Sequence, residues 1–326
     1  MRKFLIQFGL FLLFALITYS VLLTIWGNAL NGKYHKNLRY KQGLTGFMHS
    51  RLLEADTSTQ VEVLFLGSSH TYRGFDTRIF AAAGMRSFNL GSSNQTPLQT
   101  TYLLQEYVDR FRPKLVIYEV FPENFEMDGV ESAVDIISNT AHYGHVFWQA
   151  LAVNHVVVYN AFLYGFMRKV FYGDLAFREA AKVGEDTYVL GAYVQKDFRA
   201  QPRYLMAETM PLDVESVKLG DKLWRLKGKQ VAAFGESIEL LKQKNIPVLL
   251  VQAPVSKGFF EAYKNYAYTD SLFASYGLYI NFNYENLALN DSTDFYDAHH
   301  LAQSGVIKFN AALIEKIKPL GLFHFN

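Results

Sequence analysis

The sequence predicts a three-layer α/β/α sandwich with a parallel sheet, an N-terminal transmembrane helix and a mainly helical insertion. Two observations predict this class. Short apolar runs alternate with helix signals along most of the chain, and residues 4–26 carry no charged side chain. Helices placed regularly between buried strands are typical of a parallel sheet covered on both faces.

The composition excludes several kinds of protein. The 326 residues include 32 Lys and Arg against 30 Asp and Glu, so the net charge of +2 does not favour a nucleic-acid partner. There is no cysteine, which excludes disulfides, zinc–cysteine sites, iron–sulfur clusters and a thiol nucleophile. His142, His145 and His155 lack an acidic residue at a matching spacing, so we expect no metal and no cofactor.

Residues 1–27 are expected to anchor the chain in a membrane. The uncharged run 4–26 would span roughly 35 Å as a helix at ~1.5 Å per residue, slightly more than the ~30 Å hydrocarbon core. It is longer than the usual core of a cleaved signal peptide, so we expect an uncleaved signal-anchor, with removal as the alternative.

The side of the membrane is less directly indicated. Arg2 and Lys3 precede the apolar run, whereas four basic residues follow it within residues 33–41, and a count of positive charge would keep the large domain in the cytoplasm. A short basic start before an apolar run is how export signals begin, and the charge rule weakens for long translocated domains. We therefore expect the domain outside the cytoplasm, on the periplasmic side of the cell (inner) membrane.

A connector at 28–60, with a short helix near 47–54, precedes the α/β domain at 61–326. Expected strands cover residues 61–66, 87–90, 115–120, 248–251 and 278–280. Asp76 is a candidate N-cap for a helix ending at Gly84, and Thr96 and Gln99 form a capping box with Pro97. Further helices are expected near 231–245, over 259–273, and around Val306, Phe309, Leu313 and Ile317.

The α/β rhythm is interrupted at about 126–227, which we interpret as a mainly helical insertion bordering the active-site edge. Within it, residues 146–167 are apolar but include Gln149, Asn154, His155 and Asn160. These polar residues argue against a second membrane span. We expect a buried helix or one that rests against the bilayer.

Small and polar residues follow each expected strand, as in Gly67-Ser68-Ser69-His70 and Gly91-Ser92-Ser93-Asn94. Ligands of open parallel sheets bind beyond the carboxyl ends of the strands. Near the other end of the chain, Asp297 and His300 lie three residues apart, so on a helical turn they would share a face.

These residue types indicate nucleophilic catalysis. A carboxylate at Asp297 can fix the tautomer of His300, whose second nitrogen can then take the proton of a serine hydroxyl. Ser68 and Ser69 are both available, and His299 competes with His300 as the base. His70 and Arg73 are candidate substrate-binding residues beside the serines, with structural roles as the alternative.

The pattern resembles the SGNH/GDSL hydrolases, whose sheet is flavodoxin-like. Leu66-Gly67-Ser68-Ser69 is similar to the first block of that family, Asn89-Leu90-Gly91 to the second, and Asp297-Ala298-His299-His300-Leu301 with Gly305 to the last. The resemblance covers about 61–125 and 228–326. It implies Ser69 as nucleophile, His300 as base, Asp297 as its partner, and an oxyanion hole at Ser69, Gly91 and Asn124, with Asn94 as the alternative because the third block is not present as such.

The anchor together with Gly-Ser-Ser resembles membrane-anchored envelope members of that superfamily, including the D-alanine transfer protein of teichoic acid synthesis and the alginate O-acetylation proteins. That resemblance implies a serine acylesterase or O-acyltransferase acting on acyl esters of cell-envelope glycans. Expected partners are an acylated polysaccharide or acyl donor, a multi-span membrane acyltransferase, and the bilayer through residues 4–26. The alternative is a non-catalytic SGNH-like partner of such an acyltransferase, or a glycan-binding protein.

Overall fold

The computed structural model describes residues 1–30, 32–43, 46–197 and 222–323. Its centre is a five-stranded sheet in which all neighbouring strands are parallel. The order across the sheet is β2 (Ser87–Gly91), β1 (Val63–Gly67), β3 (Leu115–Glu119), β7 (Val248–Gln252) and β8 (Leu278–Asn281). This order reverses direction between β1 and β3, which is where ligands bind in sheets of this kind.

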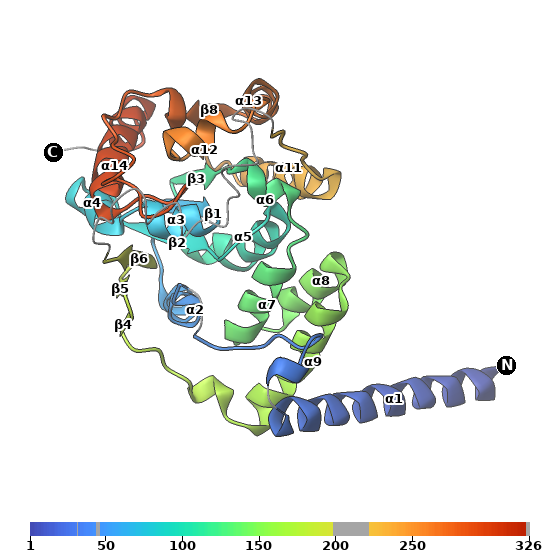
Figure 1. Ribbon diagram of the computed structural model, residues 1–326. Helices are drawn as coiled ribbons and strands as arrows, with labels where there is room; N and C mark the ends of the chain where they lie inside the picture. Colours follow the sequence, from blue (N-terminus) through green and yellow to red (C-terminus); the bar gives the residue numbers. More distant parts are fainter. Residues whose placement is uncertain (31, 44–45, 198–221, 324–326) are drawn as a thin grey trace.

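Helices cover both faces of the sheet (Figure 1). One face packs against α5 (Pro97–Phe111), α11 (Gly228–Gln243) and α13 (Tyr266–Ala274). The other packs against α4 (Thr77–Ala82) and α14 (Gln303–Ile317). Successive strand residues alternate between the two cores: Leu64 and Leu66 enter the first, and Val63 and Phe65 the second. The predicted three-layer α/β/α class is confirmed.

The helix caps follow the predicted chemistry. The Asp76 carboxylate accepts the backbone N–H of Arg78 at 3.0 Å and begins α4. Thr96 and Gln99 form the capping box of α5, with Pro97 as the first helical residue.

The helix predicted over 259–273 is wrong as a single element, because the structure has α12 (Lys257–Glu261) and α13. Between them, the Asn265 side chain hydrogen-bonds both the N–H and the carbonyl of Trp224, at 2.8 and 2.9 Å. A contact with a residue 41 positions away therefore breaks the helix.

The insertion contains more strand than predicted. Helix α6 (Pro122–Glu126) leads into it from β3, and the insertion itself begins with helices α7 (Val130–Asn139), α8 (Gly144–Val153) and α9 (Val156–Phe171). An antiparallel sheet of β4 (Lys182–Val183), β5 (Asp186–Val189) and β6 (Tyr193–Lys196) follows. The rest of the predicted insertion, apart from residues 222–227, lies outside the described residues.

Helix α1 (Arg2–Ala29) is the one helix among the described residues that is long and apolar enough to cross a membrane. The connector behind it includes α2 (Met48–Thr57), close to the short helix predicted there. Residues 146–167 form most of α8 and α9 rather than one long helix, because Asn154 adopts a left-handed backbone conformation, with φ of 53°, between them.

Candidate active site

Ser69 is the first residue of the short helix α3 (Ser69–Gly74), which begins directly beyond β1. Gly67, at the end of β1, has φ of +143°, and a Cβ there would lie 3.0 Å from the backbone oxygen of Glu119. Glycine therefore permits both the backbone conformation and the close approach to β3. Ser68, the N-cap of α3, is buried, whereas Ser69 is partly exposed.

Asp297 and His300 lie in a bend rather than on the predicted helical turn. One oxygen of the Asp297 carboxylate accepts the backbone N–H groups of His299, at 3.0 Å, and His300, at 2.7 Å. This arrangement is an Asx turn, which brings the two side chains together at the same three-residue spacing. The correction concerns the backbone and leaves the predicted pairing in place.

The structure brings Ser69, His300 and Asp297 into one chain of hydrogen bonds. The second Asp297 oxygen lies 2.8 Å from Nδ1 of His300, and Nε2 of His300 lies 2.8 Å from Oγ of Ser69. With the proton on Nδ1 donated to the carboxylate, Nε2 has a free lone pair for the serine hydroxyl. This is the geometry required of a nucleophile, its base and the group that orients the base.

The surroundings keep this chain in its reactive charge state. Burial opposes ionisation of Asp297, but hydrogen bonds from the His300 ring and the His299 N–H outweigh it, so the pKa of the carboxyl lies below its ordinary value. Burial lowers the pKa of His300, against the opposing effect of Asp297. A carboxylate beside a neutral imidazole is the resting state that base catalysis needs.

Two predicted oxyanion donors lie at the same edge. A Cβ at Gly91 would come within 2.6 Å of the Ser68 oxygen, so only glycine fits beneath the turn that presents Ser69. The buried guanidinium of Arg51, on α2, donates to the Gly91 carbonyl and holds the end of β2 in place. The donor roles of the Ser69 and Gly91 N–H groups stay predictions.

The two candidate asparagines differ. Asn124 is 5% exposed on α6, just before the insertion, and among the described residues no hydrogen bond occupies its side-chain amide. Asn94 donates its amide to the Glu131 carboxylate at 2.8 Å. Asn124 is therefore the better oxyanion candidate, and Asn94 is already committed elsewhere.

His70 and His299 form a second arrangement beside the triad. Nε2 of His70 lies 2.9 Å from Nδ1 of His299, and Nδ1 of His70 lies 3.5 Å from a carboxylate oxygen of Glu119. Glu119 is 2% exposed, and neither of its oxygens has a hydrogen-bond partner among the described residues. His70 is thus buried and bonded to a neighbouring side chain, which favours the structural alternative over substrate binding.

Each of the two neighbouring histidines stacks on an aromatic ring. The His299 ring stacks on Phe121, with centroids 5.7 Å apart, and the His300 ring stacks on Tyr296, at 5.4 Å. Burial lowers the pKa of His299, as do the charges of His300 and His70. His299 is therefore a neutral side chain packed in the wall of the site.

The insertion contacts the site through an ion pair between its Asp186 and Arg73 on α3. The Arg73 guanidinium donates to both oxygens of Asp186, on β5, at 2.9 and 2.7 Å. Since this ion pair already neutralises its charge, we do not expect Arg73 to bind an anionic substrate. The Lys196 ammonium, on β6, lies 5.1 Å from the centroid of Tyr296, the ring that stacks on His300.

A metal ion has one candidate cluster among the described residues. One ring nitrogen from each of His70, His299 and His300 lies within 4.8 Å of the others. The nitrogens of His70 and His299 are bonded to each other, and those of His300 to Ser69 and Asp297. These hydrogen bonds explain why the three histidine rings lie close together. The cluster is therefore part of the triad and of the side chains packed beside it.

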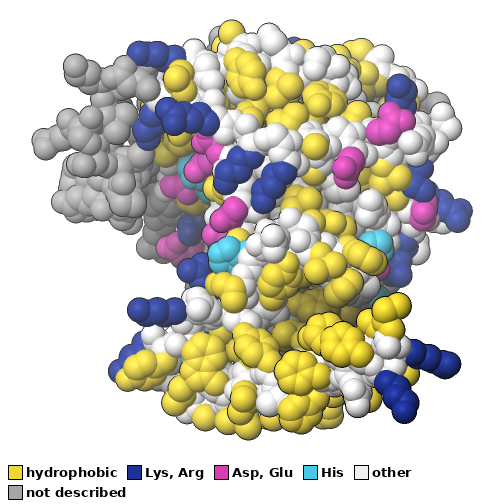
Figure 2. All heavy atoms as spheres, turned by 90° about the vertical axis from the view of Figure 1, so that its right-hand side faces the viewer, with side chains coloured by type: hydrophobic (Ala, Val, Ile, Leu, Met, Phe, Trp, Pro, Cys, Tyr) yellow, Lys and Arg dark blue, Asp and Glu magenta, His cyan; other side chains and the backbone are white. Residues whose placement is uncertain are grey.

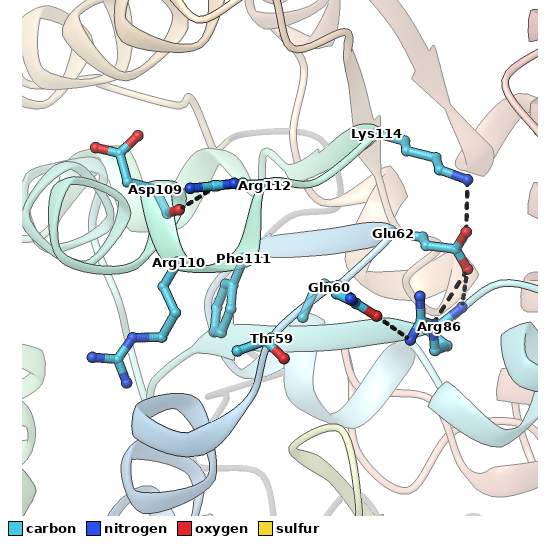
Figure 3. Close-up of a pocket in the computed structure, with 10 residues that line it drawn as sticks. Thr59, Gln60, Glu62, Arg86, Asp109, Arg110, Phe111, Arg112 and Lys114 are labelled. Carbon is cyan, nitrogen blue, oxygen red and sulfur yellow. Dashed lines mark hydrogen bonds and ion pairs between the residues drawn. The ribbon is translucent and has the colours of Figure 1, made fainter.

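A wide depression of about 530 Å³ lies at the opposite edge of the sheet, where the strands begin (Figure 3). Glu62 lies between Lys114 and Arg86 there and forms an ion pair with each, at 2.8 and 3.8 Å. Because none of the triad residues lines this depression, it is not part of the candidate active site.

Sequence reasoning missed the second histidine arrangement and the ring on His300. Their positions in the sequence could have indicated the second arrangement, because His70 follows Ser69 directly and Glu119 ends the neighbouring strand at the same edge. Tyr296 precedes Asp297 and could have been included as part of the same bend.

No protein-family model matches the sequence, and no curated protein matches it. Among solved structures, a GDSL-like lipase from Bacteroides thetaiotaomicron has 13% identity and a TM-score of 0.41, and the match covers 84% of this chain and 98% of that one. A Bacteroides fragilis protein provisionally described as an acylhydrolase has 13% identity and a TM-score of 0.39, with 87% and 100% covered. At these values the likeness alone supports no conclusion, and the assignment has to depend on the site geometry.

Proposed function

We propose that this chain is a membrane-anchored serine acylesterase or O-acyltransferase of the SGNH type. The observation that carries the proposal is the hydrogen-bond chain from Asp297 through His300 to Ser69, with 2.8 Å at each step. The three residues come from opposite ends of the sequence and meet at the carboxyl edge of the sheet, beside the reversal between β1 and β3.

The reaction proceeds in two steps. The Ser69 oxygen attacks an ester carbonyl while Nε2 of His300 takes the hydroxyl proton, and the Ser69 and Gly91 N–H groups with the Asn124 amide stabilise the oxyanion. The alkoxide leaves with the proton from His300 and an acyl-Ser69 remains. Water or a sugar hydroxyl then gives its proton to His300 and takes the acyl group, and His300 returns the proton to the departing Ser69 oxygen. The acceptor therefore decides between hydrolysis and transfer.

The proposed substrates are acyl esters of cell-envelope glycans, with the domain on the periplasmic side of the inner membrane. Helix α1 supports a single-pass anchor, since it is the one candidate span among the described residues. Orientation is tested by protease digestion of spheroplasts before and after lysis. Digestion of the domain in intact spheroplasts supports this side, and digestion only after lysis contradicts it.

The catalytic proposal is tested by labelling the full chain in detergent with a fluorophosphonate probe and mapping the adduct by mass spectrometry. We expect the adduct on Ser69, and its loss in Ser69→Ala and His300→Ala. Ser93→Ala is the matched control, because this serine follows β2 at the same edge but its hydroxyl bonds Glu131. Adduct on Ser68 instead, or none on the folded chain, would contradict Ser69 as the nucleophile, and the second outcome would favour a non-catalytic partner of a membrane acyltransferase.

A further inference from the structure

Helices α8 and α9 form a hairpin whose outer surface is apolar. Residues 146–167 contain no Asp, Glu, Lys or Arg. Large apolar side chains of the hairpin are nevertheless exposed to between 41% and 67%. They are Phe147, Trp148, Leu151, Val156, Phe166, Val170 and Phe171. Exposed apolar side chains gathered in this way mark an interaction surface.

The hairpin packs directly against the candidate membrane helix. The Tyr19 hydroxyl donates to the Asn160 side chain at 2.6 Å, and further along both helices the Tyr164 hydroxyl donates to Asn28 at 3.0 Å. Leu23 and Tyr164 share a small apolar core between them. Helix α9 therefore runs in the same direction as the last part of α1, and its amino-terminal end lies toward the part of α1 that projects from the body (Figure 1).

Figure 2 views the molecule from the side toward which the amino terminus of α1 projects. In the lower part of this view hydrophobic side chains dominate, with Lys and Arg side chains at the left and right margins, whereas in the upper part Lys, Arg, Asp and Glu side chains are scattered among hydrophobic and other ones. The apolar surface of α1 thus continues onto the protein body without a charged boundary.

One side-chain acceptor of each polar residue in the hairpin turn has a partner inside the hairpin. The Asn154 side-chain oxygen accepts the Tyr159 hydroxyl at 2.8 Å, and Nδ1 of His155 accepts the Val157 N–H at 3.2 Å. At the far end of α9, the Arg168 guanidinium donates to both oxygens of Asp174, at 3.0 and 2.8 Å. The turn can therefore enter a poorly hydrated region with these groups satisfied.

We propose that the outer face of the α8–α9 hairpin lies in the lipid bilayer interface beside α1, so that the protein has two membrane contacts. This inference rests on the proposed anchoring by α1. An apolar helical face rich in Phe and Trp is typical of interfacial segments, which enter the headgroup and acyl boundary by ~5–10 Å. A lipid surface fits better than a protein groove because the apolar surface is continuous with α1.

The test uses the natural absence of cysteine, which makes every introduced cysteine unique. The full chain carrying Trp148→Cys, Leu151→Cys or Phe166→Cys is labelled with a nitroxide and placed in vesicles of phosphatidylethanolamine and phosphatidylglycerol. Power-saturation spectroscopy then compares the access of oxygen, which concentrates in lipid, with that of a water-soluble nickel chelate. Leu12→Cys on α1 is the membrane reference. Ile307→Cys is the matched water reference, because this apolar residue on α14 is 52% exposed.

We expect the three hairpin positions to favour oxygen as Leu12→Cys does, with Ile307→Cys favouring the chelate. If the hairpin positions behave like Ile307→Cys while Leu12→Cys lies in lipid, the hairpin proposal is overturned and the anchor stands. Water access at Leu12→Cys would instead overturn the anchor. Exclusion of both reagents at the hairpin would show a protein-covered face, such as a second copy, and would also overturn the lipid assignment.

Discussion

Two acid–histidine pairs meet at the carboxyl edge of the sheet, and they differ in what the histidine can reach. Asp297 accepts two backbone N–H groups and the His300 ring, whose other nitrogen faces the partly exposed Ser69. Glu119 is buried beside His70, whose other nitrogen faces the ring of His299. The first pair ends at a nucleophile and the second at another imidazole. The partners of a histidine therefore indicate its role better than its burial or its place in the sequence.

The largest contrast is expected when His300 is removed from the first arrangement and His299, the ring that His70 faces, from the second. His300→Ala, like Ser69→Ala, should lower turnover of a p-nitrophenyl ester by roughly 10⁴-fold or more, because the nucleophile loses its base. His299→Ala should lower it by about tenfold or less, since that ring packs in the wall. Circular dichroism checks folding, and equal losses for the two histidine variants would contradict the assignment.

The next largest difference in kcat is expected between variants of the two acids, Asp297 and Glu119. Asp297→Asn keeps the size of the side chain but favours the wrong His300 tautomer, so we expect kcat to fall by about 10³–10⁴-fold. Glu119→Gln should change kcat by less than about tenfold, because no atom of Glu119 contacts Ser69 or His300 through a described hydrogen bond. Steady-state kinetics on one ester measures both variants. A greater loss for Glu119→Gln than for Asp297→Asn would assign the catalytic acid role to Glu119.

The two asparagines at this edge extend the comparison to the oxyanion. Asn124→Ala should lower kcat by about 10²–10³-fold with a small effect on KM, as expected for a donor used mainly in the transition state. Asn94→Ala is the control, because its amide is bonded to Glu131, and we expect its kcat to stay near that of the parent chain. The reverse ranking would make Asn94 the donor.

The pH profile tests His300 as the base of the first arrangement. The base must be neutral, and burial lowers the pKa of His300 below its ordinary value of 6.5. We therefore expect kcat/KM to be flat above pH 6.5 and to fall tenfold per unit only below the lowered pKa, as His300 takes up a proton. Glu119→Gln should leave this limb in place. A limb above pH 6.5 would contradict a buried base.

The smallest expected effect concerns stability. His70→Ala removes the partner of His299 and leaves Glu119 beside a cavity, so the free energy of unfolding should fall by about 1–3 kcal/mol. Urea denaturation measures this change. Turnover of the folded fraction should stay within about tenfold of the parent chain, and a far greater loss in turnover with unchanged stability would assign His70 to the chemistry.

Much of the fold follows from local signals. The strands, the Asp76 cap and the Thr96 capping box depend on residues close in sequence, so their positions could be predicted within a few residues. The break before α13 depends on Asn265 bonding Trp224, and no local pattern carries that information. The β4–β5 hairpin had a signal that was not used, since Gly184, with φ of +60°, stands in a two-residue turn.

The candidate site divides in the same way. Asp297 and His300 could be selected because base catalysis limits the residue types and their spacing, whereas Ser69 was chosen over Ser68 by the resemblance of Leu66-Gly67-Ser68-Ser69 to the first SGNH/GDSL block. The choice between Asn94 and Asn124 needed the structure, because it depends on which amide is already bonded. The pairing of Arg73 with Asp186 joins α3 to a strand 113 residues away, so no spacing rule could have found it.

Two contacts of the insertion relate the candidate membrane helix to the candidate active site. Through Asn160 it contacts α1, and through Asp186 it holds Arg73, four residues after Ser69. With α1 in a bilayer, this one segment works as a spacer that sets the height of the serine above the lipid. On the proposed function, we expect an ester to be selected by the length of its carrier as well as by its chemistry, and lengthening or shortening the insertion to change which carriers can deliver it.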